Sequence, residues 1–214
     1  MKQIFIFGAS TVYGVGGEEG GWADMLKREL HKRMYYKGGP GEIFEVYIFA
    51  KPGATVEFIF ENFENQIKKY SRGDEKIAIV SVGMNNTKAV GNPNDFVSDI
   101  EIYKKSMNDL LVKMKLKVDE VICVGYRPVD ESKTLPKLNP VGGSPSYFWN
   151  ERINKFNKVY KQVCQELGVK FIDLNIDKGE WITKYLNEDG LHPNTKGHEL
   201  IFQKLLPEVE NLLK

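Results

Sequence analysis

The sequence is poor in the residues that form metal sites and disulfide bonds, with two cysteines and three histidines among 214 residues. Cys123 lies in an apolar, strand-like stretch and Cys164 in a helix-like one, so we expect both to be buried free thiols. No group of cysteines and histidines has the spacing of zinc ligands. We therefore expect a protein that needs neither a metal ion nor another cofactor.

A strong excess of charge and a long apolar run are also missing. The 30 basic and 29 acidic residues leave a net charge of +1, which gives no electrostatic reason to expect nucleic acid or an anionic membrane as partner. No stretch is long enough to span a membrane, and the apolar run at residues 4–7 is too short for a signal peptide. We expect a soluble cytoplasmic protein that binds no nucleic acid and does not insert into membranes; no oligomeric state is predicted.

Short apolar runs alternate along the chain with longer amphipathic ones, and this alternation predicts an α/β fold with a parallel sheet covered on both faces. The runs rich in β-branched and aromatic residues predict strands at 3–7, 44–49, 77–82, 121–124 and 170–172. Apolar residues three and four apart predict helices at 22–36, 56–70, 94–117, 147–167 and 195–213. Because no linker or repeat divides the chain, we expect a single domain over residues 1–214.

Ser10 follows the first predicted strand, between Gly8 and Gly14. In parallel sheets ligands bind at the carboxyl ends of the strands, so a serine there is a candidate nucleophile. A serine that merely caps a helix or turn is an equally common explanation. The glycines do not form a phosphate-binding motif, since neither G-x-G-x-x-G nor a terminal Gly-Lys-Ser/Thr is present, and this disfavours a nucleotide-binding protein.

Asp189 and His192 form an Asp-x-x-His pattern near the C-terminus. An aspartate three residues before a histidine can accept the Nδ1 proton of the imidazole and leave Nε2 free to act as a base. The alternative is that Asp189 or Asn194 only begins the last helix. His31 lies among basic residues and is expected to be exposed, and His198 lies inside the last predicted helix with an expected structural role, so His192 is the strongest candidate base.

Two further strand ends carry groups that could bind an oxyanion. Asn85 follows the third strand in Gly83-Met84-Asn85-Asn86, and its side-chain amide could donate to the oxygen of a tetrahedral intermediate. Gly53 follows the second strand, where a glycine lets the main chain approach a substrate closely. Taken alone, each segment is also typical of an ordinary turn.

The longest predicted loop spans residues 125–146 and contains four prolines. Loops of this length in compact domains are usually functional or mobile. Because the loop follows the fourth strand, we expect it to form, with Tyr147, Phe148 and Trp149, a wall that selects the substrate. The alternative is a surface loop whose aromatic residues begin the apolar face of the next helix.

The four segments resemble, in order and spacing, the sequence blocks of the SGNH (GDSL-type) family of esterases and lipases. The resemblance implies a flavodoxin-like three-layer sandwich with a five-stranded parallel sheet in the order 2-1-3-4-5. It also implies that Ser10 is the nucleophile, His192 the base and Asp189 the residue that orients it. The Ser10 N–H, the Gly53 N–H and the Asn85 side chain would then form the oxyanion hole.

Two positions depart from the family pattern. Ala9 stands where the family has an acid before the serine, and Asn86 where it has an acid after the oxyanion-hole asparagine. Neither position takes part directly in the triad, and we expect both to support the site through hydrogen bonds. The departures affect the expected rate and substrate more than the reaction type.

The favoured function is therefore hydrolysis of a carboxylic ester through an acyl-serine intermediate, with a small-molecule ester as substrate. Acetyl, other short-acyl and lipid esters all fit this expectation. The alternative is a non-catalytic or weakly active binding module on the same fold, which the loss of the two acids would favour.

Overall fold

The computed structural model describes residues 1–34, 42–72, 75–139 and 142–213. Its centre is a parallel sheet of the strands β1 (Lys2–Gly8), β2 (Phe44–Ala50), β3 (Glu75–Ser81), β5 (Glu120–Val124) and β7 (Lys170–Ile172). The strand order is β2-β1-β3-β5-β7, which confirms the predicted order of the five strands. The central strand is β3, and β1 lies between it and the edge strand β2.

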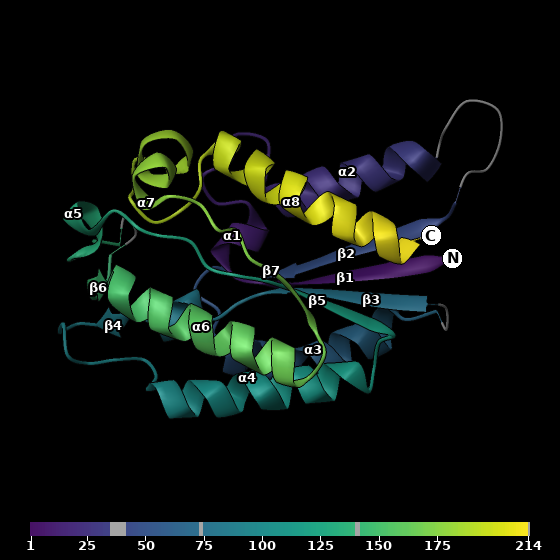
Figure 1. Cartoon of the computed structure of the whole chain (residues 1–214), viewed down its shortest axis with the longest axis horizontal. Helices are drawn as coiled ribbons and strands as arrows, with labels where there is room; N and C mark the ends of the chain where they lie inside the picture. The colour runs from purple at the N-terminus through teal and green to yellow at the C-terminus, as the bar shows by residue number, and fades with distance from the viewer. Residues whose placement is uncertain (35–41, 73–74, 140–141, 214) are drawn as a thin grey trace.

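Helices cover both faces of the sheet and form three layers (Figure 1). One face carries α2 (Trp22–Met34) and α8 (Thr195–Leu213), and the other carries α3 (Val56–Tyr70), α4 (Ile100–Lys115) and α6 (Asn150–Glu166). The alternation of side chains along β1 explains both contacts, because Ile4 and Ile6 pack toward α2 and α8 whereas Phe5 and Phe7 pack toward the other helices. Continuous apolar runs are therefore needed in the inner strands.

The predicted helices at 56–70 and 195–213 have the observed bounds, whereas two others begin later than predicted. The helix predicted from residue 94 begins at Ile100, because the Asp99 carboxylate accepts the N–H groups of Glu101 and Ile102 and caps it there. The helix predicted from residue 147 begins at Asn150. The end of the helix predicted at 22–36 lies outside the described residues.

Short elements gather at the carboxyl ends of the strands, on the left in Figure 1. They are α1 (Ser10–Tyr13), η1 (Met84–Asn86), β4 (Ala89–Val90), α5 (Glu131–Thr134), β6 (Ser146–Tyr147), α7 (Lys178–Glu180) and η2 (Trp181–Tyr185). Strands β4 and β6 pair antiparallel, which explains why residue 147 belongs to a strand and not to the following helix. These elements surround the end of the sheet where the candidate residues lie.

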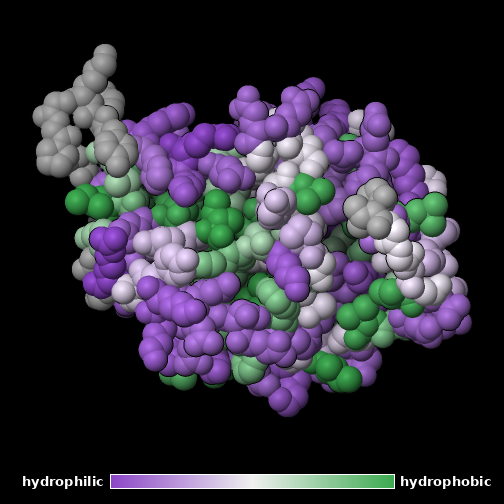
Figure 2. Space-filling view, turned by 180° about the vertical axis from the view of Figure 1, so that it is seen from behind, coloured by the Kyte–Doolittle hydropathy of each residue, from purple (hydrophilic) through white to green (hydrophobic). Residues whose placement is uncertain are grey.

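The surface and the buried thiols agree with a packed α/β protein. In Figure 2, hydrophilic side chains cover much of the visible face, and hydrophobic ones form separate patches between them. Within the described part of the chain, no helix combines the length and the apolarity needed to cross a membrane. Cys123 on β5 and Cys164 on α6 are buried and free, as predicted.

Candidate active site

Ser10 is the first residue of α1, and only Ala9 separates it from the end of β1. A side chain at Gly8 would meet Val12 Cγ2 at 2.3 Å and the Ser81 carbonyl oxygen at 2.5 Å, so only glycine allows α1 to turn this tightly off β1. Gly14 ends the helix in the left-handed conformation, with φ 95°. The two glycines that flank Ser10 in the sequence thus fix the single turn that presents it at the sheet end.

Asp189 and His192 form a tight turn just before α8. Asp189 Oδ1 accepts the N–H groups of Leu191 at 2.9 Å and His192 at 3.0 Å, which fixes the backbone between the two residues. Helix α8 is capped by a different residue, since Asn194 Oδ1 accepts the Gly197 N–H at 2.9 Å. Of the two residues considered as the start of α8, Asn194 therefore has that role, and the Asp189 carboxylate turns toward the histidine.

The turn and the serine are 182 positions apart in the sequence, and the fold brings them into contact. His192 Nε2 lies 2.9 Å from Ser10 Oγ, and His192 Nδ1 lies 2.5 Å from Asp189 Oδ2. With the proton on Nδ1, the imidazole donates to the carboxylate and accepts the serine hydroxyl proton. The three side chains then form one continuous chain of hydrogen bonds.

The environment of Asp189 favours its charged form. Burial opposes the charge, but hydrogen bonds from the His192 side chain and from the backbone N–H groups of His192 and Leu191 outweigh it and hold the pKa of Asp189 well below its ordinary value. The carboxylate is therefore negatively charged at neutral pH and accepts the Nδ1 proton.

The other two histidines lie elsewhere. His198 is fully buried on α8, where its Nδ1 accepts the Trp22 N–H at 3.2 Å and its Nε2 donates to the Val15 carbonyl at 3.0 Å. This is the structural role expected for it. His31 on α2 is partly buried, not exposed as predicted.

Gly53 and Asn85 reach the site from the ends of β2 and β3. Residues 51–54 form a turn in which the Ala54 N–H donates to the Lys51 carbonyl at 3.0 Å, and Gly53 takes the positive φ of 84° that such a turn requires. Asn85 is buried, and its Nδ2 donates to the Ala54 carbonyl at 3.0 Å. This hydrogen bond holds the asparagine against the glycine turn.

The predicted residues lie around a groove of about 470 Å³. Ser10, Gly53, Asn85 and His192 all line it. Ser10, Asn85 and His192 also line a smaller cavity of about 20 Å³, together with Met84 and Phe148. The groove has the size of a site for a small ligand, and the smaller cavity has room for a group of a few atoms.

The two departures from the family pattern have different surroundings. Asn86 is buried; its Oδ1 accepts the Val56 N–H at 3.0 Å at the start of α3, and its Nδ2 donates to Glu57 Oε2 at 2.9 Å. Ala9 makes no side-chain hydrogen bond and lines the small cavity. Asn86 thus forms supporting hydrogen bonds without the acid, whereas at position 9 the methyl group can neither donate nor accept one.

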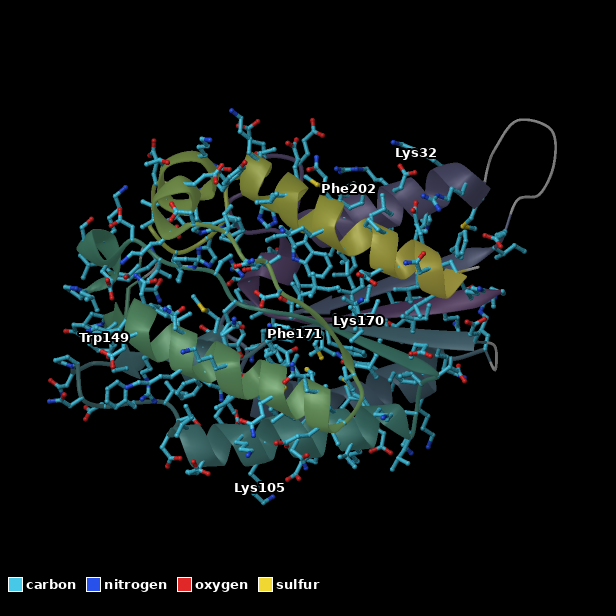
Figure 3. All side chains as sticks on the ribbon, in the orientation of Figure 1. Lys32, Lys105, Trp149, Lys170, Phe171 and Phe202 are labelled. Atoms are coloured by element: carbon cyan, nitrogen blue, oxygen red, sulfur yellow. The ribbon has the colours of Figure 1, made fainter. Side chains whose placement is uncertain are left out.

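The segment 125–146 lies beside the groove and carries α5 within it. Its residues Lys137, Leu138 and Asn139 line the groove, and residues 140–141 lie outside the described part. Of the three aromatic residues that follow, only Phe148 lines the groove and the small cavity. Tyr147 and Trp149 stack on each other with 5.9 Å between ring centroids, and Trp149 lies at the start of α6 (Figure 3).

Three basic residues that line these cavities were not predicted from the sequence: Lys88, Arg127 and Lys137. Arg127 is 6% exposed and donates to Thr11 Oγ1, but its Nε has no hydrogen-bond partner. Burial lowers the pKa of Arg127 to about 10, so the group is still charged at neutral pH. Its place three residues after β5 is a signal that could have identified it, whereas nothing near Lys88 or Lys137 in the sequence indicates a cavity.

Comparisons with known proteins agree with this architecture. Residues 6–200 match the GDSL-like Lipase/Acylhydrolase family. A lipase/acylhydrolase from Enterococcus faecalis has a similar structure, with a TM-score of 0.73 and 19% sequence identity over 99% of this chain and 96% of that one. A member of the lipolytic G-D-S-L family from Veillonella parvula has a TM-score of 0.70 and 18% identity, over 97% of each chain.

The acetyl xylan esterase Axe2 from Geobacillus stearothermophilus, in a W215I variant, is a third similar structure. Its TM-score is 0.68 and its identity 18%, over 97% of this chain and 94% of that one. The search among curated proteins finds no match. At these identities the structural matches establish the fold, and the family match covers most of the sequence. The chain therefore belongs to the GDSL-like lipase/acylhydrolase family and is a carboxylic ester hydrolase of the SGNH type.

Proposed function

We propose that the protein hydrolyses esters through an acyl intermediate on Ser10, with His192 as general base and Asp189 as the residue that orients it. The observation that carries this proposal is the chain of contacts from Ser10 Oγ to His192 Nε2, at 2.9 Å, and from His192 Nδ1 to Asp189 Oδ2, at 2.5 Å. It ends at the groove, where the serine can meet a substrate.

In the first half of the reaction Ser10 Oγ attacks the ester carbonyl while its proton passes to His192 Nε2. The tetrahedral intermediate collapses, the carbon–oxygen bond to the alcohol breaks, and His192 returns the proton to the leaving alcohol. In the second half water attacks the acyl-serine, again with His192 as base, and releases the acid and the free Ser10 hydroxyl. Asp189 stabilises the imidazolium that forms in each half without becoming protonated.

The oxyanion of each intermediate needs hydrogen-bond donors. We propose the backbone N–H groups of Ser10 and Gly53 and the Asn85 side chain. One amide hydrogen of Asn85 already donates to Ala54, so the other is available for the substrate. The positive φ of Gly53 lets the main chain lie open along the groove, since a Cβ built there would meet nothing within 4 Å.

The small cavity favours esters with a short acyl group. Its volume of about 20 Å³ accommodates an acetyl methyl group more readily than a lipid chain, and Met84 and Phe148 supply apolar contacts. We propose acetyl or another short acyl group as the acid part of the substrate. Axe2, an acetyl xylan esterase, has the same fold.

Two broader features belong to the same proposal. We propose that residues 1–214 form one domain, because helices on both faces share one sheet and the family match spans residues 6–200. We also propose a cytoplasmic location, for which the two buried free thiols are the supporting feature.

A fluorophosphonate probe and a series of nitrophenyl esters graded by acyl length test the proposal. The parent is expected to be labelled at Ser10 and to prefer short acyl groups, and Ser10→Ala is expected to lose both labelling and turnover. Asp189→Asn is expected to lower kcat by on the order of 10⁴-fold, because it reverses the hydrogen bond to His192.

Ser146→Ala is the matched control, because Ser146 also lines the groove but has no contact with His192 among its described hydrogen bonds. It should keep labelling and turnover. A folded parent that neither reacts with the probe nor cleaves any ester would instead be a binding module. Turnover at the parent rate in Ser10→Ala would show that the nucleophile is wrongly assigned.

A further inference from the structure

The lining of the groove and of the small cavity has an uneven charge. Three basic side chains line them: Lys88 and Lys137 in the groove and Arg127 in the small cavity. No aspartate or glutamate is among the described lining residues of either space. In a protein whose total charge is only +1, this is a local concentration of positive charge at the place where a substrate binds.

Two of the three basic side chains have polar partners within the site. Lys137 Nζ lies 3.4 Å from Asp189 Oδ2 and donates to the Asp189 carbonyl at 3.1 Å. Arg127 donates to Thr11 and lies in the small cavity, which is the proposed place of the acyl group. Their positions are therefore explained in part by the structure of the site itself.

Lys88 has no such partner. Its side chain forms no hydrogen bond, ion pair or aromatic contact with any residue that the structure describes, although it is half-buried. Burial lowers the pKa of its ammonium group, and no neighbouring charge compensates for the lost solvation. An unpaired, partly desolvated cation is a costly arrangement unless a ligand supplies the opposite charge.

The backbone around Lys88 is held firmly. Its carbonyl accepts the Val97 N–H at 2.9 Å, and the neighbouring residues Thr87 and Ala89 are fully buried, the latter in the β4–β6 pair. The lysine is thus anchored at the wall of the groove that Asn85 also lines, and is not part of a freely moving surface segment.

We propose that the alcohol part of the substrate carries a negatively charged group, which Lys88 binds in the groove with Lys137 nearby. This inference rests on the proposed ester hydrolysis and names the chemical class of its substrate: a short-chain ester of an anionic alcohol. The acyl group occupies the small cavity and the alcohol the larger groove, because only the groove has room for more than a few atoms.

The test compares two aryl acetates that differ in charge, 4-acetoxybenzoate and its neutral methyl ester. The measured quantity is the kcat/KM of the anionic ester divided by that of the neutral ester. Comparing this ratio between variants removes the intrinsic reactivity of each ester, because that reactivity is the same for every variant. Lys88→Met removes the charge and keeps the aliphatic stem, and Lys88→Arg restores the charge. The control is Lys105→Met on α4, whose side chain is 79% exposed and points away from the sheet (Figure 3).

The ratio is expected to fall about tenfold in Lys88→Met. The attraction in a half-buried charge pair is stronger than in an exposed pair and weaker than in a fully buried one. It should recover in Lys88→Arg and stay at the parent value in Lys105→Met, which changes the net charge equally. Higher salt should lower the ratio in the parent and change it little in Lys88→Met, because ions screen the attraction. An equal ratio in the parent and in Lys88→Met, with unchanged melting temperatures, overturns the proposal.

A binding measurement separates this inference from the proposed reaction. Calorimetry of the Ser10→Ala variant with 4-hydroxybenzoate and with its methyl ester needs no turnover. Tighter binding of the anion that is lost in the Ser10→Ala, Lys88→Met double variant supports the anionic alcohol even if neither acetate is hydrolysed. Equal binding of the two compounds overturns it, whether or not the esters are cleaved.

Discussion

Asn86 stands at a position where the family pattern has an acid, and its surroundings explain why an amide is suitable in this chain. Its Nδ2 donates to Glu57 Oε2 at 2.9 Å. Burial disfavours the charge on Glu57, but hydrogen bonds that include the one from Asn86 hold the pKa of this carboxyl below its ordinary value. A second carboxylate at position 86 would face Glu57 and could not donate.

Asn86→Asp is therefore expected to lower the free energy of unfolding by about 3 kcal/mol, because it buries two facing carboxylates and removes a hydrogen bond. Adding Glu57→Gln should restore most of the loss, since the glutamine amide can donate to the new aspartate. Urea unfolding of the two single variants and the double variant measures the coupling between them. Additive effects would show that Glu57 and residue 86 do not interact in this way.

Ala9 is the second position that departs from the family pattern, and Arg127 shares its surroundings. Both line the small cavity, and among the described residues Arg127 forms no ion pair with a carboxylate. An acid at position 9 would lie beside a buried guanidinium whose Nε has no partner. The change from alanine to aspartate would thus supply a missing counter-charge.

Ala9→Asp is expected to raise the free energy of unfolding by about 1–3 kcal/mol, the usual contribution of a hydrogen bond to a charged group. Ala9→Asn, which has nearly the same shape without the charge, should give a smaller gain. Thermal unfolding in the Arg127→Met background provides the decisive comparison. There Ala9→Asp should lose its benefit, and an undiminished gain would mean that the new carboxylate binds elsewhere.

His198 links two helices at the scale of elements. From α8 it accepts the N–H of Trp22, the first residue of α2, and donates to the Val15 carbonyl in the loop between α1 and α2. Both hydrogen bonds form only with the neutral imidazole of His198, because a proton on Nδ1 would face the Trp22 N–H. Burial lowers the pKa of His198 to about 4.

The sign of the resulting pH dependence follows from the lower pKa in the folded state. Above about pH 6.5 the histidine is neutral in both states, and its environment has its full stabilising effect. As the pH falls from about 6.5 to about 4, the unfolded chain binds the proton first and the folded state loses stability, by roughly 3 kcal/mol in total. His198→Gln should show a weaker loss than the parent over this pH range in urea unfolding; parallel curves would contradict the assignment.

The sequence predicted the long elements well, because their apolar patterns reflect burial on the two faces of the sheet. The five strands and the helices α3 and α8 are where the periodicity placed them. The starts of α4 and α6 were wrong because local contacts, the Asp99 cap and the β4–β6 pair, override a weak periodic signal. Elements of two to four residues are too short for any periodicity to show.

At the scale of the whole molecule, the site joins residues from both ends of the chain. The sequence could propose Ser10, Asp189 and His192 as candidates because each lies in a short motif whose chemistry is recognisable locally, and their catalytic roles stay predictions. Lys88, Arg127 and Lys137 could not be found in the same way, since their role depends on which surfaces the fold places around the groove. The predicted wall is accurate for Phe148 as a lining residue, and its part in choosing the substrate stays a prediction.

The two ends of the described chain lie side by side in Figure 1, where Lys2 Nζ donates to the Leu213 carbonyl at 2.7 Å. A short flexible linker can therefore join them, and the chain can be reopened between Leu116, which is 77% exposed, and Lys117. In this circular permutant the aspartate and histidine would precede the serine in the sequence, while the positions of all three in space stay the same. It is expected to fold and to keep the esterase activity of the parent, so that loss of activity in a folded permutant would contradict the assignment. The order Ser, Asp, His along the chain is then not a requirement of the chemistry.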